Sequence, residues 1–595
     1  MPPKTIHSAT RKEVFMKLIN YTKKLLIGLY SSLKRFPLTI LFSASVALVL
    51  IIISETTSPN KYLLYRLSLI LALGIPVSLC IKLFLEKKEL GKKTIAFIGS
   101  HILGITFLIL YYFLFLKNIQ LNSIIRYSAV TLSLYMAFLF IPYLVKKENF
   151  EMYVITIFTS FFVTVIYSII LYLGLSAILF TIDKLLEINV LTKIYYYTWL
   201  IVIFLFSMCY FLSGIPPKDK ELSIKSYPKL LKILLLYIIM PLLTVYTIIL
   251  YIYFVKILAT SNWPIGMVSH LVAWYSIIVT MVFFFITPIK EENFWQNEFL
   301  KFSPKIILPL IIMMFISISI RITAYGVTEN RYFIVILGIW LFFIMIYLSF
   351  TKKTKNIILP ITISIVSLIS VFGPLSCYSI SKLSQNNRFE SILIKNNMLR
   401  DNQIRTSNSI SQEDKFQING ILDYFNRNHS LKEINYLPQD FKLADTKDVL
   451  GFDFISPNNK SNKEYFNFTR DESEQAINIE NYDYLFHITN VKDENAPSNS
   501  SFTASYNYNT SIIKINHEGD ELYTKNLNTF INTLTEKHSI IPKENSLPQE
   551  ELTLSDKNAN VKVKLIFSHI YGNVDMENKI FNITGIDFYV LVKIK

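Results

Sequence analysis

The chain has little charge for its length. Asp, Glu, Lys and Arg make up only 17% of its 595 residues, whereas an average soluble protein has roughly 25%. Hydrophobic residues make up 52%, and the long uncharged runs lie before residue 377. This composition excludes an ordinary soluble protein and predicts a polytopic membrane protein, a bundle of transmembrane α-helices.

Cysteine is also scarce. The three cysteines, Cys80, Cys209 and Cys377, lie in or at the end of apolar runs, and residues 378–595 contain none. A disulfide framework in the C-terminal part is therefore excluded. We interpret the three thiols as small buried hydrophobic side chains.

Sequence patterns for metal binding and for phosphate binding are missing. There is no His-Glu-x-x-His, no Cys-x-x-Cys and no glycine-rich phosphate loop, and each of these would mark a known chemistry. His487, His517, His538 and His569 are scattered without ligand spacing. We therefore predict no cofactor and no metal site, and the sequence identifies no catalytic residue.

The net charge of +16 is unevenly distributed. Residues 1–377 contain 35 Lys and Arg against 14 Asp and Glu, a balance of +21, and residues 378–595 contain 24 against 29, a balance of −5. The basic excess thus belongs to the membrane half, where loop lysines set the topology. Because no soluble segment is strongly basic, we do not predict nucleic acid as a partner.

Residues 37–377 are predicted to be a membrane domain of about eleven transmembrane helices. A hydrocarbon core about 30 Å thick needs roughly 20 apolar residues. The runs that approach this length are 37–53, 62–84, 94–116, 124–145, 154–180, 195–214, 230–255, 268–288, 306–324, 332–350 and 357–377.

The loops between these runs predict the direction of the chain. The N-terminal segment and every second loop contain 26 Lys and Arg, and the alternate loops and adjoining helix ends contain nine. Short positively charged loops stay in the cytoplasm. We therefore predict a protein of the bacterial cytoplasmic (inner) membrane with its N-terminus inside and the last span leading outside.

Residues 1–36 are predicted to form a cytoplasmic basic amphipathic segment. Apolar side chains recur at helical spacing from Val14 to Phe36 among several lysines. Two interpretations stay open: an interfacial helix on the anionic inner leaflet, or a charge cluster that only sets the topology.

Beyond residue 377 the chain becomes polar. Helical periodicity over 381–399 and 413–425 predicts a helical connector at 378–430. Alternating patterns at 484–491, 501–506, 511–516, 561–571, 579–585 and 586–595 predict strands, and His517-Glu518-Gly519-Asp520 is typical of a hairpin turn. We expect residues 431–595 to form an extracytoplasmic α+β domain.

The candidate site residues lie in three segments that the topology predicts on the outer face. Trp and Tyr are also ordinary anchors at a membrane interface, so each residue alone has a structural explanation. The candidates are Trp263, Pro264, Gly266, Ser269, Arg321, Tyr325, Gly326, Thr328, Glu329, Arg331, Tyr332, Gln385 and Arg388.

These segments also carry a family resemblance. The chain resembles the uncharacterised bacterial multi-span membrane proteins of domain-of-unknown-function family 4153. The resemblance is carried by Lys34-Arg-Phe-Pro37, Pro264-x-Gly-x-Val-Ser269, Arg321-Ile-x-x-Tyr-Gly-x-Thr-Glu-x-Arg-Tyr332 and Gly373-Pro374 with the helix that follows. It implies a location in the bacterial cell envelope, and it implies no activity.

We interpret the outer-face residues as a structural or recognition cluster of a non-enzymatic protein. In this hypothesis Arg321 or Arg331 pairs with Glu329, and Gln385 and Arg388 dock the following helix. The expected partners are the lipid bilayer and an envelope protein or lipid ligand. Two alternatives stay open: a small-molecule transporter, or an envelope enzyme acting on a lipid-linked or glycan substrate through Glu55, Asp183 and Glu329.

Overall fold

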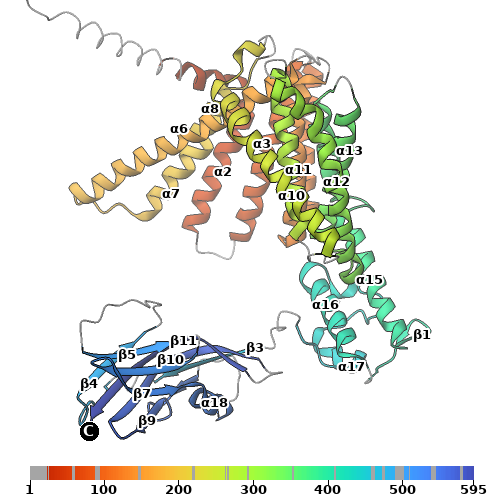
Figure 1. The fold of residues 1–595 in the computed structure, drawn as a ribbon. Coiled ribbons are helices and arrows are strands. Elements are labelled where there is room, and N and C mark those ends of the chain that lie inside the picture. Colours follow the sequence, from red (N-terminus) through yellow and green to blue (C-terminus); the bar gives the residue numbers. More distant parts are fainter. Residues whose placement is uncertain are drawn as a thin grey trace, which may run out of the picture. The chain divides into compact units, whose positions relative to one another are not determined.

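The computed structural model contains a helical part and a β-rich part (Figure 1). It describes residues 23, 26–56, 61–87, 94–144, 149–217, 222–260, 263, 267–290, 294–351, 354–407, 410–456, 463–471, 476–489, 501–507, 510–537, 545–575 and 580–595. Most of the predicted basic segment 1–36 therefore lies outside the described residues, and its described residues 26–35 are helical.

Ten helices of the described chain are long and apolar enough to cross a membrane. The chain is thus a multi-pass membrane protein, as the composition predicted. A helix satisfies its backbone hydrogen bonds internally, which hydrocarbon requires. The helices are α2 (Pro37–Glu55), α3 (Lys61–Lys87), α4 (Thr94–Phe115), α5 (Leu121–Phe140), α6 (Phe150–Leu185), α7 (Thr192–Ile201) continued by the π-helical η3 (Val202–Ser207) and α8 (Met208–Ser213), α9 (Lys229–Ile233) continued by the π-helical η5 (Leu234–Ile239) and α10 (Met240–Thr260), α11 (Met267–Ile286), α12 (Phe294–Tyr325) and α13 (Glu329–Phe350).

The run predicted as the eleventh span contains a shorter helix. Helix α14 (Ile358–Ile369) has 12 residues, which is about 18 Å of helix. A turn with Gly373 at φ +79° follows, and α15 (Cys377–Lys395) begins where the predicted span ends. The Ser376 side chain caps α15 by accepting a hydrogen bond from the Ser379 backbone N–H, so the chain changes direction within the apolar run.

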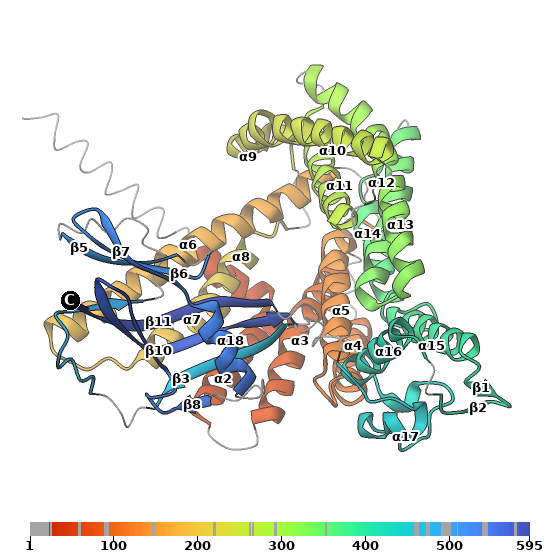
Figure 2. The same ribbon diagram turned by 60° about the horizontal axis from the view of Figure 1, so that its bottom comes forward.

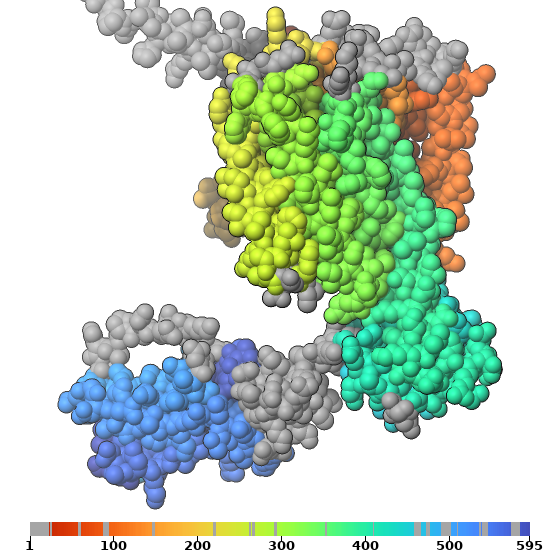
Figure 3. Space-filling view, turned by 45° about the vertical axis from the view of Figure 1, so that its right-hand side comes forward, coloured from red at the N-terminus to blue at the C-terminus, as the bar shows by residue number. Residues whose placement is uncertain are grey.

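Helices α10 to α13 pack side by side (Figure 3). Met314 of α12 is fully buried and faces Gly338 of α13. A Cβ atom on Gly338 would lie 2.2 Å from the Met314 Cε atom. Small residues let membrane helices approach closely, so Gly338 sets the close contact between α12 and α13.

Helices α6 and α7 lean away from the other membrane helices in both ribbon views (Figures 1 and 2). The α6 helix has 36 residues, a length of about 54 Å. Many of its apolar side chains are exposed, among them Phe161, Ile166 and Ile169. This hairpin therefore presents much of its surface to lipid.

The C-terminal region is β-rich and contains helices, which confirms the predicted α+β character. Its main sheet has the order β4-β11-β10-β3-β8, with β9 paired to β10, and a second sheet has the order β5-β6-β7. The elements are α16 (Gln412–Asn428), α17 (Thr446–Leu450), β3 (Lys463–Arg470), β4 (Tyr484–Ile488), β5 (Phe502–Asn507), β6 (Ile512–His517), β7 (Asp520–Asn526), α18 (Asn528–Lys537), β8 (Asn545–Leu547), β9 (Thr553–Lys557), β10 (Val561–Asp575) and β11 (Ile580–Ile594).

The hairpin predicted at 517–520 is present. His517 pairs with Asp520, and Glu518 and Gly519 between them have φ of +51° and +97°, as a two-residue hairpin loop requires. The two strands predicted at 579–585 and 586–595 are instead one strand, β11, in which Gly585 pairs with Tyr571 of β10. Strands β3, β8 and β9 were not predicted.

The chain divides into two compact units. The helical unit contains residues 1–403 together with residues 425–439, and the β-rich unit contains residues 404–424 and 440–595. The boundaries differ from the predicted domains because the short segment 425–439 belongs with the membrane helices. We call residues 425–439 the docked segment.

Candidate functional site

The turn between α12 and α13 is shaped by a glycine. Gly326 follows the last residue of α12 and has φ of +68°, a conformation that glycine adopts without steric penalty. A Cβ atom at this position would lie 2.7 Å from the Gln385 Nε2 atom. Both the backbone conformation and the close approach of α15 therefore require glycine here.

Helix α15 binds this turn through two polar side chains. The Gln385 amide donates to the carbonyl oxygens of Tyr325 at 3.1 Å and Val327 at 2.9 Å. The Ser384 hydroxyl accepts a hydrogen bond from the Val327 N–H at 2.8 Å. Gln385 is 3% exposed, so its amide is held in place by the turn that it satisfies.

Two arginines also bind carbonyl groups of this turn. Arg331 donates to the carbonyl oxygens of Tyr325 at 3.0 Å and Gly326 at 2.6 Å, and Arg388 donates to Tyr325 at 3.3 Å. Burial lowers the pKa of Arg388, but a guanidinium stays charged in proteins. Tyr325, Gly326, Arg331, Gln385 and Arg388 are called the turn cluster below.

The carboxylate of Glu329 pairs with a histidine of the docked segment. Its Oε1 atom lies 2.7 Å from Nε2 of His429, and the side chains are 9% and 4% exposed. Glu329 is in the first turn of α13, where the helix dipole favours a negative charge. The predicted pairing of Glu329 with Arg321 or Arg331 is thus not the arrangement found, because Arg331 binds carbonyl groups.

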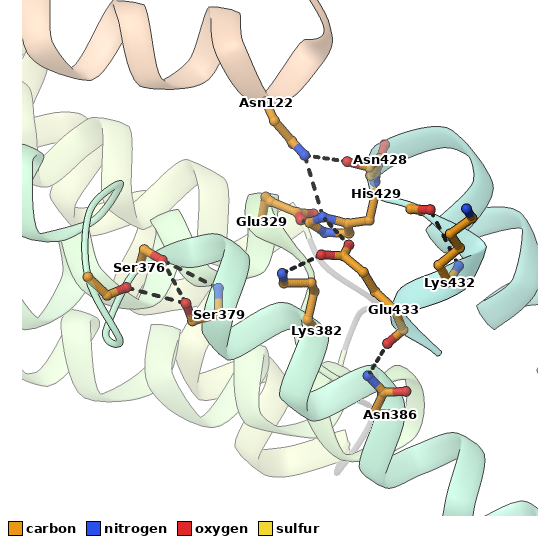
Figure 4. Close-up of polar contacts among 12 residues, drawn as sticks. Asn122, Glu329, Ser376, Ser379, Lys382, Asn386, Asn428, His429, Lys432 and Glu433 are labelled. Carbon is orange, nitrogen blue, oxygen red and sulfur yellow. Dashed lines mark hydrogen bonds and ion pairs between the residues drawn. The ribbon is translucent and has the colours of Figure 1, made fainter. Parts of the chain in front are cut away.

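Asn122 contacts His429 from the opposite side of the imidazole ring (Figure 4). Its amide nitrogen lies 3.4 Å from His429 Nδ1 and also donates to the Asn428 carbonyl. Both ring nitrogens of His429 therefore have a polar partner, Glu329 at Nε2 and Asn122 at Nδ1. The Tyr378 hydroxyl donates to the Asn122 carbonyl at 2.7 Å, so α5 and α15 both support the histidine.

A second ion pair joins α15 to the docked segment. Lys382 Nζ lies 2.8 Å from Glu433 Oε1, and Glu433 Oε2 is 4.0 Å from His429 Nδ1. Asn386 donates to the Glu433 carbonyl at 2.9 Å (Figure 4). It also accepts a hydrogen bond from the Asn435 N–H at 2.8 Å. The docked segment is therefore bound through side chains and backbone groups together.

The structure brings together only part of the predicted set. Thr328 precedes α13 in extended conformation, and the Tyr332 hydroxyl donates to the Leu375 carbonyl. Ser269 is fully buried in α11, and its hydroxyl lies 3.4 Å from the Ser317 hydroxyl of α12. Ser317 lies about two helical turns before Tyr325 of the turn cluster.

Three further candidates complete the comparison with the sequence. Trp263 packs against the core of the membrane helices, and Pro264 and Gly266 lie outside the described residues. Arg321 belongs to α12, one turn before Tyr325, and its Nε atom is buried without a hydrogen-bond partner in the described part of the chain. We find no explanation in the structure for that unpaired atom.

The three acids proposed for an enzyme have separate partners. Glu55 lies 2.8 Å from Lys193 Nζ, and Asp183 accepts from the Val190 N–H at 3.0 Å, whereas Glu329 binds His429. Among the described residues, no three His, Cys, Asp or Glu side chains gather as a metal site would require. The geometry supports binding of one protein segment by another.

Comparison with known proteins gives a family model and a curated relative. The family model for a domain of unknown function, DUF4153, matches residues 39–407. An uncharacterised protein of Pasteurella multocida (strain Pm70) is 24% identical over 268 residues, which cover 44% of this chain and 46% of that protein. The match thus spans about half the length of that relative. No solved structure matches the chain.

Proposed function

The chain belongs to the DUF4153 family, and for this member we propose a non-enzymatic role in the bacterial cell envelope. In this proposal the membrane helices form a base, and the turn cluster fixes α15 to the α12–α13 turn. The Glu329–His429 and Lys382–Glu433 pairs fasten the docked segment to this base. The chain continues from the fastened segment into the β-rich unit, and this unit recognises an envelope protein or a lipid.

The location in the cytoplasmic membrane is supported by the loop charges. The N-terminal segment and alternate loops hold 26 of the 35 Lys and Arg residues before residue 378, and such loops stay cytoplasmic. With the N-terminus inside, the α12–α13 turn and the docked segment face outward. The C-terminal β-rich unit is then extracytoplasmic.

The observation that carries the proposal is the burial of Glu329 against His429. Removing one partner of a buried pair leaves a polar group without compensation, at a cost of about 3–5 kcal/mol. The contact therefore resists opening much more strongly than an exposed ion pair, for which roughly 0–1 kcal/mol is typical. A contact of this strength suits a segment that anchors a further domain to the membrane helices.

Limited proteolysis of the purified full-length protein in detergent tests the proposal. Replacing the carboxylate in Glu329→Gln weakens the contact with His429, and we expect cleavage between residues 396 and 439 at least fivefold faster than in the wild type. Glu55→Gln is the matched control, because Glu55 also has an ion-pair partner but is half exposed. Equal cleavage rates in all three proteins would overturn the proposal.

A further inference from the structure

An elongated cavity lies between α6 and the α3, α5 and α7–α8 helices. Its volume is about 640 Å³, within the roughly 300–1,000 Å³ typical of ligand pockets. The wall is formed almost entirely by apolar and aromatic side chains, including Leu79 of α3, Phe138 of α5, Ile157 of α6 and Met208 of α8. An occupant must therefore be apolar over nearly its whole length.

The dimensions of the cavity fit one hydrocarbon chain. The α6 residues of the wall run from Val154 to Tyr172, about 27 Å of helix, close to the roughly 30 Å of a bilayer core. Spread over this length, the volume leaves a cross-section of roughly 24 Å², and a carbon chain in van der Waals contact is about 4 Å wide. One extended chain therefore fills the space better than a compact ligand does.

The cavity is open toward lipid along α6. Phe161, Val165 and Ile169 belong to its wall, and their side chains are 50%, 37% and 53% exposed. Both ribbon views show α6 leaning away from the neighbouring helices (Figures 1 and 2). A chain can thus enter sideways from the bilayer, where hydrocarbon is the surrounding solvent.

The serine hydroxyl groups of the wall are already satisfied. Ser168 donates to the Thr164 carbonyl at 2.7 Å, and Ser207 donates to the Val202 carbonyl at 2.8 Å across the π-helical turn η3. The two hydroxyls also lie 2.6 Å apart. Each has a single hydrogen, so neither serine has a donor left for a polar ligand. A π-helical turn often occurs at functional sites.

We propose that this cavity binds one acyl chain of a membrane phospholipid, held lengthwise between α6 and the α7–α8 helix. The site is formed by other helices than the turn cluster and does not depend on the proposed attachment of the docked segment. Because the chain enters from hydrocarbon, the hydrophobic effect does not hold it, and van der Waals contact with the cavity wall does.

Photo-crosslinking in lipid vesicles tests this inference. The full-length protein is reconstituted in phosphatidylethanolamine and phosphatidylglycerol with a trace of phospholipid carrying a diazirine on one acyl chain, and labelled residues are mapped by mass spectrometry. We expect labels to concentrate on the cavity wall. Thr164→Trp, which fills the cavity from a buried position, should lower wall labelling at least fivefold, while Ile166→Trp on the exposed face of α6 should leave it unchanged.

A second variant and a competition complete the test. Ser207→Phe fills the cavity from the opposite wall and should have the same effect as Thr164→Trp, with a wild-type elution profile as the check on folding. In the wild type itself, labelling in simple proportion to exposure over all helices would overturn the inference. Loss of wall labelling to added polyprenyl phosphate, but not to unlabelled phospholipid, would also overturn it, because the occupant would then be an isoprenoid chain.

Discussion

Glu329 and His429 are 100 residues apart in the sequence, and their side chains meet at 2.7 Å in a buried contact. The carboxylate belongs to the first turn of a membrane helix, and the imidazole belongs to the docked segment. Burying either polar group without its partner would cost free energy. The contact therefore makes the position of the docked segment depend on two specific side chains.

Substitution of the glycine at the α12–α13 turn should destabilise the helical unit. Gly326→Ala places a Cβ atom at φ +68° and 2.7 Å from the Gln385 amide, and we expect a loss of about 1–3 kcal/mol in the free energy of unfolding. Gly174→Ala is the control, because no atom lies within 4 Å of the added Cβ. That change replaces glycine in a helix and should stabilise the protein by up to about 1 kcal/mol. Thermal unfolding in detergent should give a lower melting temperature for Gly326→Ala and a higher one for Gly174→Ala than for the wild type. Equal shifts in melting temperature would contradict this explanation of the turn.

The β-rich unit should lose stability in acid through Asp556. A hydrogen bond from the Lys525 ammonium lowers the pKa of Asp556 below its ordinary value, and Tyr523 donates to the same carboxylate at 3.0 Å. A carboxyl group with a lowered pKa stabilises the fold above its ordinary pKa of about 4, and the stabilisation is lost as the pH falls through the lowered value. The protection of the β9 and β10 amides, measured as the intrinsic exchange rate at each pH divided by the observed rate, should therefore fall in the wild type below about pH 4.

The variant Asp556→Asn is the control for this pH dependence. It lacks the titrating carboxylate, so its protection factors should change less than those of the wild type over the same pH range. Parallel curves for the two proteins would show that other carboxyl groups control the acid response.

The direction of the chain in the membrane can be measured by labelling of introduced cysteines. The natural cysteines Cys80, Cys209 and Cys377 are all buried, so they give a low background. In intact spheroplasts, a membrane-impermeant maleimide should label Glu550→Cys of the β-rich unit and should label Lys225→Cys only after the membrane is opened. The reverse pattern would contradict the orientation derived from the loop charges.

The membrane helices were predictable from the sequence because each is a long local run of apolar residues. The turn cluster was also predictable in part, since Gly326, Arg331, Gln385 and Arg388 are polar or flexible residues next to such runs. The short α14 was not predictable, because the apolar pattern continues through the turn after it. The sequence pattern divides β11 into two strands at Gly585, because glycine indicates a break. In the structure, the pairing of β11 with β10 continues through this residue.

The contact that fastens the docked segment left no local signal. His429 follows a polar helix, and its charged neighbour Glu433 four residues later gives no indication of Glu329. Asn122 lies 307 residues before His429. Sequence reasoning paired Glu329 with nearby arginines because proximity in the chain was the only information available. A contact between such distant segments can be predicted only when the packing of α5, α13 and α15 is known.

A double-mutant cycle on Glu329 and His429 examines whether the two side chains act together. Hydrogen exchange measures the opening of the docked segment, where the His429, Glu433 and Ile434 N–H groups donate to carbonyls of residues 425, 430 and 431. Glu329→Ala and His429→Ala should each speed exchange. The double variant should lose less opening free energy than the two single variants lose together, with a coupling energy of about 1–3 kcal/mol. Additive effects, or unchanged exchange in the single variants, would show that the docked segment is held by other contacts.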